Sequence, residues 1–133
     1  MTRPPGGAPP PTQAALTGYA PVDLVELARE ICTRYRAEFP DEEGRYGDAG
    51  VAWCLHDNQH ILNWAIEARN GRVDLVRELD WLARVLEARG FPLERLVRDL
   101  EIAADVTREH VPAIADELAA GARFVRATSS PSP

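Results

Sequence analysis

Apolar side chains recur every three or four residues along most of the chain, and proline and glycine interrupt this pattern at several points. The clearest example is the series Leu75, Leu79, Leu82 and Leu86, which places leucines on one face of a helix. Because no segment alternates apolar and polar residues over a strand's length, the pattern predicts helices and no sheet. We therefore expect an all-α fold, an up-and-down bundle of four to five helices with disordered termini.

Proline and capping residues set the expected starts of these helices. Pro21 suits a first helical position, and Pro40 should end that first helix. A loop is expected over residues 41–47, with Asp48 as the cap of the second helix. Pro112 either kinks the fourth helix or opens a fifth. The expected helices span residues 21–39, 49–69, 73–89, 92–110 and 112–126.

Glycines mark the expected ends of the second and third helices. Asn70-Gly71 closes the second, and Gly90 is the expected left-handed residue after the third. Phe91 should then fold back onto Leu86, as in a Schellman turn. Because the links between the second, third and fourth helices are so short, these helices should be antiparallel neighbours.

The 133 residues suffice for one domain with a modest core. Residues 1–20 are rich in proline and glycine and are expected to form a disordered tail. The helical bundle domain should occupy residues 21–126, and residues 127–133 should form a second disordered tail.

The composition excludes several kinds of function. All 15 basic residues are arginines, so chemistry that needs a lysine is excluded. The net charge of -6, with arginines interspersed among acids, argues against nucleic-acid binding. No apolar run is long enough for a membrane span, and the two cysteines favour a reduced, cytoplasmic chain. A chain rich in alanine, arginine, proline and glycine but without lysine is typical of high-GC bacteria.

The segment Cys54–His60, with the sequence CLHDNQH, places five consecutive polar residues inside an otherwise apolar helix. At about 100° per residue, Asn58 falls in the middle of the apolar stripe that contains Leu55 and Leu62. A buried amide without partners costs on the order of 1–3 kcal/mol. We therefore expect Asn58 to bind another helix, a water molecule or a ligand.

The opposite face of this helix carries Trp53, His60 and Trp64, with His56 and Asp57 beside them. If the helix is central in the bundle, this face is buried. If it is not, the face is an exposed aromatic patch, which would indicate an interface or a ligand groove. Trp81 lies off the leucine stripe of the next helix. It could therefore belong to the buried face or to the exposed patch.

His56 and His60 are four residues apart, a spacing that can hold one metal ion on a helix. A third ligand would have to come from Cys32, Glu109 or His110. An acid–base enzyme is a further alternative, in which His60 works with Asp57 or Glu109.

Three segments of the chain resemble the helical modules of bacterial cobalamin-binding regulators and corrinoid proteins. They are His60–Ala68, residues 75–82 and Glu87–Leu96, the last containing an Arg-Gly-x-Pro turn between helices. The pair Glu109-His110 is similar to the Glu-His pair of cobalamin-capping helices, although the Asp-x-His-x-x-Gly motif that binds cobalt is absent. The resemblance implies a helical cap or sensor module without its cofactor domain.

Our leading hypothesis is a small, non-enzymatic regulatory protein that acts by protein–protein interaction, with a protein partner or as a homodimer. It needs no cofactor and binds neither nucleic acid nor a membrane. The alternatives are a sensor of a tetrapyrrole, haem or metal with a site inside the bundle, and the acid–base enzyme. The expected partner- or ligand-binding residues are Trp53, His56, Asp57, Asn58, His60, Trp64 and Trp81.

Overall fold

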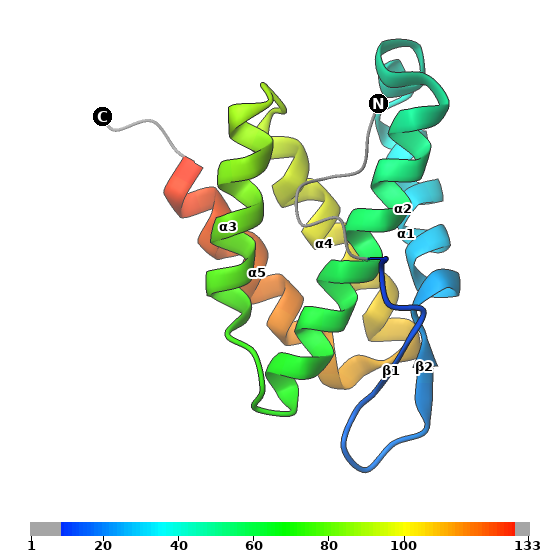
Figure 1. Cartoon of the computed structure of the whole chain (residues 1–133), viewed down its shortest axis with the longest axis vertical. Helices are drawn as coiled ribbons and strands as arrows, with labels where there is room; N and C mark the ends of the chain where they lie inside the picture. The colour runs from blue at the N-terminus through cyan, green and yellow to red at the C-terminus, as the bar shows by residue number, and fades with distance from the viewer. Residues whose placement is uncertain (1–8, 130–133) are drawn as a thin grey trace.

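The helices that the periodicity predicted form an all-α bundle, shown in the computed structural model of Figure 1, which describes residues 9–129. Two short strands precede the helices, and a 3-10 turn, η1, precedes the last one. None of the described helices is both long and apolar enough to cross a membrane. The elements are β1 (Gln13–Ala15), β2 (Pro21–Asp23), α1 (Leu24–Glu38), α2 (Asp41–Arg69), α3 (Leu75–Ala88), α4 (Leu93–His110), η1 (Pro112–Ile114) and α5 (Ala115–Ser129).

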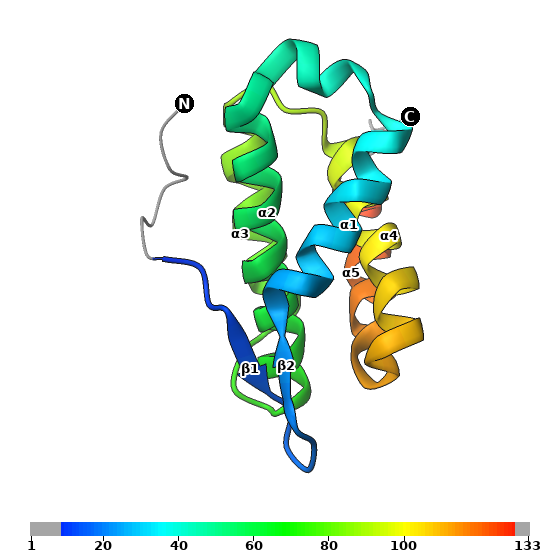
Figure 2. The same ribbon diagram turned by 90° about the vertical axis from the view of Figure 1, so that its right-hand side faces the viewer.

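Helices that follow one another in the sequence pack antiparallel around one core (Figure 1). Helices α2 and α3 run side by side and are joined by a short turn, and α4 and α5 form the most extensive helix pair (Figures 1 and 2). Helix α1 packs against α2 and α4, while α5 also contacts α3. All four leucines of the α3 stripe are buried, as the spacing predicted.

The predicted helix ends are confirmed at both glycines. Gly71 and Gly90 have φ values of 80° and 77°, a left-handed conformation that glycine adopts without steric cost. The backbone N–H of Phe91 donates to the carbonyl of Leu86 at 3.0 Å, which is the Schellman bond expected there. Pro112 opens a new element, because α4 ends at His110, with Val111 as its C-cap, and η1 leads into α5.

Part of the predicted N-terminal tail is ordered, so the expectation of disorder over residues 1–20 is wrong for part of this range. Strands β1 and β2 pair antiparallel, and Leu16 between them is 3% exposed. Residues 1–8 lie outside the described residues. The strand pairing also moves the start of the first helix from the expected Pro21 to Leu24. Asp23 caps that helix by accepting hydrogen bonds from two backbone N–H groups in its first turn.

The other end of the chain differs in the same way. Residues 127–129 continue α5, although the sequence predicted that a tail begins at residue 127. Residues 130–133 lie outside the described residues.

Asn70 connects the hairpin formed by β1 and β2 to the bundle. Its Oδ1 accepts hydrogen bonds from the backbone N–H and the hydroxyl of Thr17, and its Nδ2 donates to the carbonyl of Ala15. Gln59 of α2 adds a second anchor by donating to the carbonyl of Pro11 at 3.0 Å. Side chains that lie far along the sequence therefore hold the N-terminal segment on α2.

Residues 41–46 are helical, so the loop expected over residues 41–47 is wrong. The first turn of α2 carries Asp41, Glu42 and Glu43, and acidic residues stabilise the positive end of a helix. The helix breaks at Gly47, whose φ of 63° and ψ of -153° are outside the helical region. Because of this kink, the first turns of α2 bend over one end of the bundle (Figure 2).

The role of Asn70 predicts the effect of its removal. We expect Asn70→Ala to lower the free energy of unfolding by about 1–2 kcal/mol, because three hydrogen bonds to residues 15–17 are lost. Backbone amides of β1 and β2 should also exchange hydrogen faster. Asn63→Ala is the matched control, since Asn63 is on the same helix and forms no side-chain hydrogen bond within residues 9–129. Unchanged exchange in the hairpin of Asn70→Ala would contradict this role.

Candidate functional site

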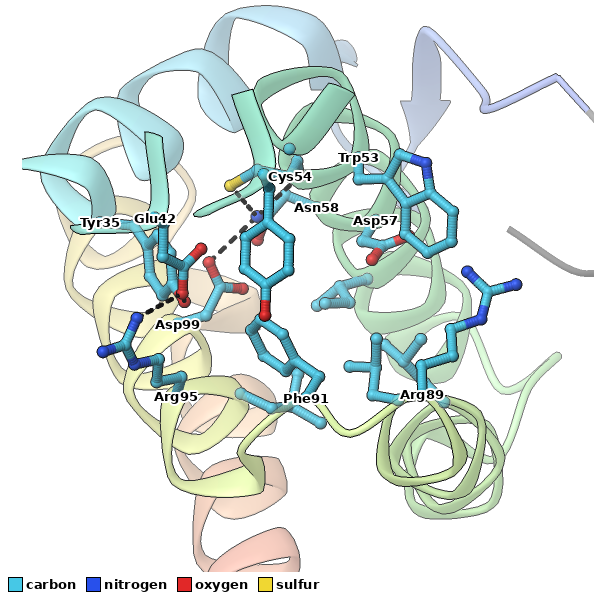
Figure 3. Close-up of a pocket in the computed structure, with 16 residues that line it drawn as sticks. Tyr35, Glu42, Trp53, Cys54, Asp57, Asn58, Arg89, Phe91, Arg95 and Asp99 are labelled. Atoms are coloured by element: carbon cyan, nitrogen blue, oxygen red, sulfur yellow. Dashed lines mark hydrogen bonds and ion pairs between the residues drawn. The ribbon is translucent and has the colours of Figure 1, made fainter. Parts of the chain in front are cut away.

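A pocket of about 180 Å³ is lined by residues from both ends of the α1–α2 and α3–α4 connections (Figure 3). These two connections lie at the same end of the bundle (Figure 1). The kink at Gly47 places Tyr46 and Glu42 on one wall. The Schellman turn after α3 places Phe91 and Arg89 on another. The lining residues are Tyr35, Glu42, Tyr46, Gly50, Trp53, Cys54, Asp57, Asn58, Ile61, Leu82, Leu86, Arg89, Phe91, Arg95, Leu96 and Asp99.

Asn58 and Asp99 form the polar floor of this pocket. Asn58 of α2 is 1% exposed, and its Nδ2 donates to Oδ1 of Asp99 on α4 at 3.0 Å. The same Nδ2 donates to the carbonyl of Cys54 at 3.0 Å. The amide oxygen of Asn58 is buried and has no hydrogen-bond partner within residues 9–129. Asn58 therefore bonds to another helix as the sequence predicted, but only through its Nδ2, and its one acceptor atom is left without a partner in the described chain.

Tyr35, Glu42 and Arg95 form a connected polar wall beside this floor. The hydroxyl of Tyr35 donates to Oε2 of Glu42, which also accepts from Nη1 of Arg95 at 2.9 Å. The second guanidinium nitrogen of Arg95 donates to Asp41 at 3.0 Å, and the guanidinium lies over the ring of Phe39 at 4.5 Å. The positive charge of Arg95 is thus already paired with two carboxylates.

The opposite wall is formed by Trp53, Asp57 and Arg89. The guanidinium carbon of Arg89 lies 4.2 Å from the centre of the Trp53 ring, and Figure 3 shows the side chain reaching up toward that indole. Asp57 is half-buried, and its Oδ1 lies 3.3 Å from Nδ1 of His56. The neighbouring His56 does not line the pocket, but its Nε2 is also buried without a hydrogen-bond partner in the described chain.

Burial changes the proton affinity of the groups that line the pocket. Desolvation raises the pKa of Asp99 to about 7, although the hydrogen bond from Asn58 opposes this. Desolvation also raises the pKa of Asp57 to about 6, against the opposing hydrogen bond to His56. A hydrogen bond with Cys32 and burial raise the pKa of Cys54. The pocket therefore contains carboxyl groups that change charge near neutral pH.

The structure separates the predicted site residues into two groups. Trp53, Asp57 and Asn58 all line the pocket. His56, His60 and Trp64 instead form a row of neighbouring rings along α2, with centroids 4.7 Å and then 5.9 Å apart.

Trp81 stands apart from both groups and is 44% exposed on α3. Both Trp53 and Trp64 are half-buried, so the tryptophans do not share one exposed surface.

The residues proposed as third metal ligands lie elsewhere. Cys32 is 3.7 Å from Nδ2 of Asn58, while Glu109 and His110 cluster with Glu30 at the exposed end of α4. Within residues 9–129, no group of three possible ligands includes His56 or His60. Both glutamates of this cluster already pair with Arg34, at 2.7 Å and 3.0 Å.

Sequence reasoning missed several residues of the pocket, of which Asp99 is the most important. Asp99 is three residues after Leu96 and four before Ala103, so it lies on the apolar stripe of α4 just as Asn58 lies on that of α2. That shared position was a readable signal for a polar pair in the core. Tyr46 and Arg89 gave no such signal, because the backbone at Gly47 and Gly90 determines where they lie.

Comparison with known proteins identified no relative: no family model, no curated protein and no solved structure matches the chain. The similarity to cobalamin-binding modules therefore stays a prediction.

The raised pKa of Asp99 predicts how stability depends on pH. Between its ordinary value of about 4 and about 7, folded Asp99 keeps a proton that the unfolded chain releases. The free energy of unfolding should therefore fall as pH rises through this window, by on the order of a few kcal/mol. Urea unfolding at several pH values should show this slope.

Asp99→Asn should flatten the slope without removing it, because Asp57 contributes in the same direction up to about pH 6. Asp105→Asn, a change at an exposed position on the same helix, is the matched control. A slope that Asp99→Asn leaves unchanged would show that Asp99 does not hold this proton.

Proposed function

We propose that this protein is a non-enzymatic binding protein that holds a small molecule in the pocket between α2, α3 and α4. The observation that carries the proposal is the buried amide oxygen of Asn58, which lacks a hydrogen-bond partner within residues 9–129 and lines a cavity. Buried polar groups in folded proteins are nearly always paired, so an unfilled acceptor beside a cavity indicates a bound group.

The size of the pocket supports a small ligand. A cavity of about 150 Å³ accommodates a molecule the size of benzene. The pocket here is about 180 Å³, which suits a single ring or a short chain with one polar group. This volume is too small for a haem or a cobalamin, so the proposal retains the predicted site inside the bundle but not the tetrapyrrole.

The lining of the pocket supports the same proposal. Tyr46, Trp53 and Phe91 supply aromatic surface, and Leu82 and Leu86 supply aliphatic surface. Polar groups lie at the floor and on two walls, where Arg95 already pairs with Glu42 and Arg89 lies over Trp53. Apolar surface combined with a few convergent polar groups is typical of small-molecule sites.

The proposal is tested with a panel of small ring compounds that differ in charge: indole, benzyl alcohol, benzylamine and benzoate. We expect at least one to bind saturably and to shift the NMR signals of pocket residues, including the indole N–H of Trp53. Leu86→Trp should abolish this binding, because a larger side chain at a pocket-lining position fills the cavity.

Val76→Trp is the matched control on the same helix. Val76 is 41% exposed and does not line the pocket, so this variant should bind as the original protein does. Circular dichroism and thermal unfolding establish that both variants are folded. If no compound shifts the pocket residues of the folded protein, the proposed function is wrong.

The leading hypothesis from the sequence, interaction with a protein partner or a second copy, stays a prediction with one specific observation in its favour. Trp81 and Val76 are exposed on α3, and large exposed apolar side chains are typical of interfaces. Light scattering over a range of concentrations tests self-association. We expect Trp81→Ala to lower the apparent mass at high concentration if α3 forms the interface, whereas Trp64→Ala should not, because Trp64 is half-buried.

A further inference from the structure

We propose that the pocket selects a ligand with a protonated amine on a small apolar body, with the amine directed at Asn58 and Asp99. This inference rests on the proposed function and names the chemical class of its ligand. Three observations support it. The acceptor of Asn58 has no partner in the described chain, carboxyl groups line the pocket, and both arginines of the lining already interact with other side chains.

The hydrogen bonds of Asn58 determine what the ligand must offer. Its Nδ2 is occupied by the carbonyl of Cys54 and by Asp99, which fixes the amide so that the oxygen is the unfilled atom. Asp99 accepts through Oδ1, and its Oδ2 takes part in no hydrogen bond within residues 9–129. A group that fills this floor must therefore donate hydrogen bonds, and an ammonium group has three donors and no acceptor.

Charge favours the same group. Asp57, Asp99 and Glu42 line the pocket, and the chain has no lysine to balance them. Arg95 is paired with Glu42 and Asp41, and Arg89 lies over Trp53. Ionised carboxylates would repel an anionic ligand at the floor, whereas they would attract a cation.

The position of Arg89 shows that this environment already attracts a cation. Its guanidinium lies over the face of Trp53 and interacts favourably with the charge of Asp57. Arg89 reaches this position from an exposed location at the turn after α3. It therefore acts as an internal competitor for a cationic ligand.

Protonation of Asp99 connects ligand binding to pH. Because burial raises the pKa of Asp99 to about 7, an ammonium ion must displace a proton from it below that pH. Affinity for an amine should then rise with pH up to about 7 and level off above it, whereas a neutral ligand should show no such rise.

Several other titratable or charged groups surround Asp99 in the pocket. They are Tyr35 and Cys32 on α1, Glu42, Cys54 and Asp57 on α2, Arg89 after α3 and Arg95 on α4.

Three probes that share a phenyl ring and differ in the head group test the inference: 2-phenylethylamine, 2-phenylethanol and 3-phenylpropionate. Each is titrated into the full chain at about pH 8, where Asp99 is ionised, and the pocket signals are followed by NMR. We expect the amine to bind about tenfold more tightly than the alcohol, and the propionate to bind most weakly. The preference for the amine over the alcohol should shrink at about pH 5.5.

Asp99→Asn should reduce the preference for the amine to about twofold or less and leave the affinity for the alcohol nearly unchanged. Arg89→Ala provides a second variant that does not disturb the core, and it should strengthen amine binding several-fold by removing a competing cation. Arg84→Ala is its matched control, since Arg84 is exposed on α3 and pairs with Asp80 and Glu87 away from the pocket.

The outcomes separate this inference from the proposed function. Equal affinity for amine and alcohol would overturn the inference, as would tighter binding of the propionate, while the pocket would remain a binding site. An unchanged amine preference in folded Asp99→Asn would overturn it as well. If none of these probes nor any compound of the wider panel binds, both proposals fail, and an ordered water is then the partner of Asn58.

Discussion

The hydrogen bond between Asn58 and Asp99 joins α2 to α4 at the point where the core meets the pocket. Both residues lie on the apolar stripe of their helix, and both are buried. A polar pair in such a position restricts which helix faces can meet, because another register would leave each group without its partner. Because both side chains are polar, apolar packing alone does not fill this part of the core, and the cavity lies directly beside the pair.

The remaining walls of the pocket depend on two backbone features rather than on further core packing. Gly47 breaks α2 and turns its first part, with Glu42, toward Arg95 of α4. At the end of α3, Gly90 allows the turn that brings Phe91 back to Leu86. Each feature needs a positive φ, which glycine adopts at little cost. The pocket is therefore built between two glycine-dependent turns that close around a fixed polar floor.

Most of the fold could be predicted from the sequence because helical periodicity and helix-stop signals agree at α3, α4 and α5. The leucines of α3 and the turn at Gly90 are examples in which local and tertiary preferences coincide. The N-terminal hairpin could not be predicted, because its strands are only three residues long and its anchor is Asn70, far along the sequence. The helical turn at residues 41–46 was missed for a similar reason, since Arg95 stabilises it from another helix.

For the candidate site, the sequence identified one side of the pocket and not the other. Asn58 could be recognised because a polar residue in an apolar stripe requires a partner, and the same argument applied to α4 would have found Asp99. Trp53 and Asp57 were identified for a different reason, as part of a supposed opposite face. Trp53, Asp57 and Ile61 line the pocket and are four residues apart, so they form one row along α2. This row lies between the apolar stripe that contains Asn58 and the opposite face that contains His60. A helical wheel drawn for one helix divides it into buried and exposed sides. A pocket at the end of a bundle lies on the boundary between them, and only the neighbouring helices show where that boundary falls.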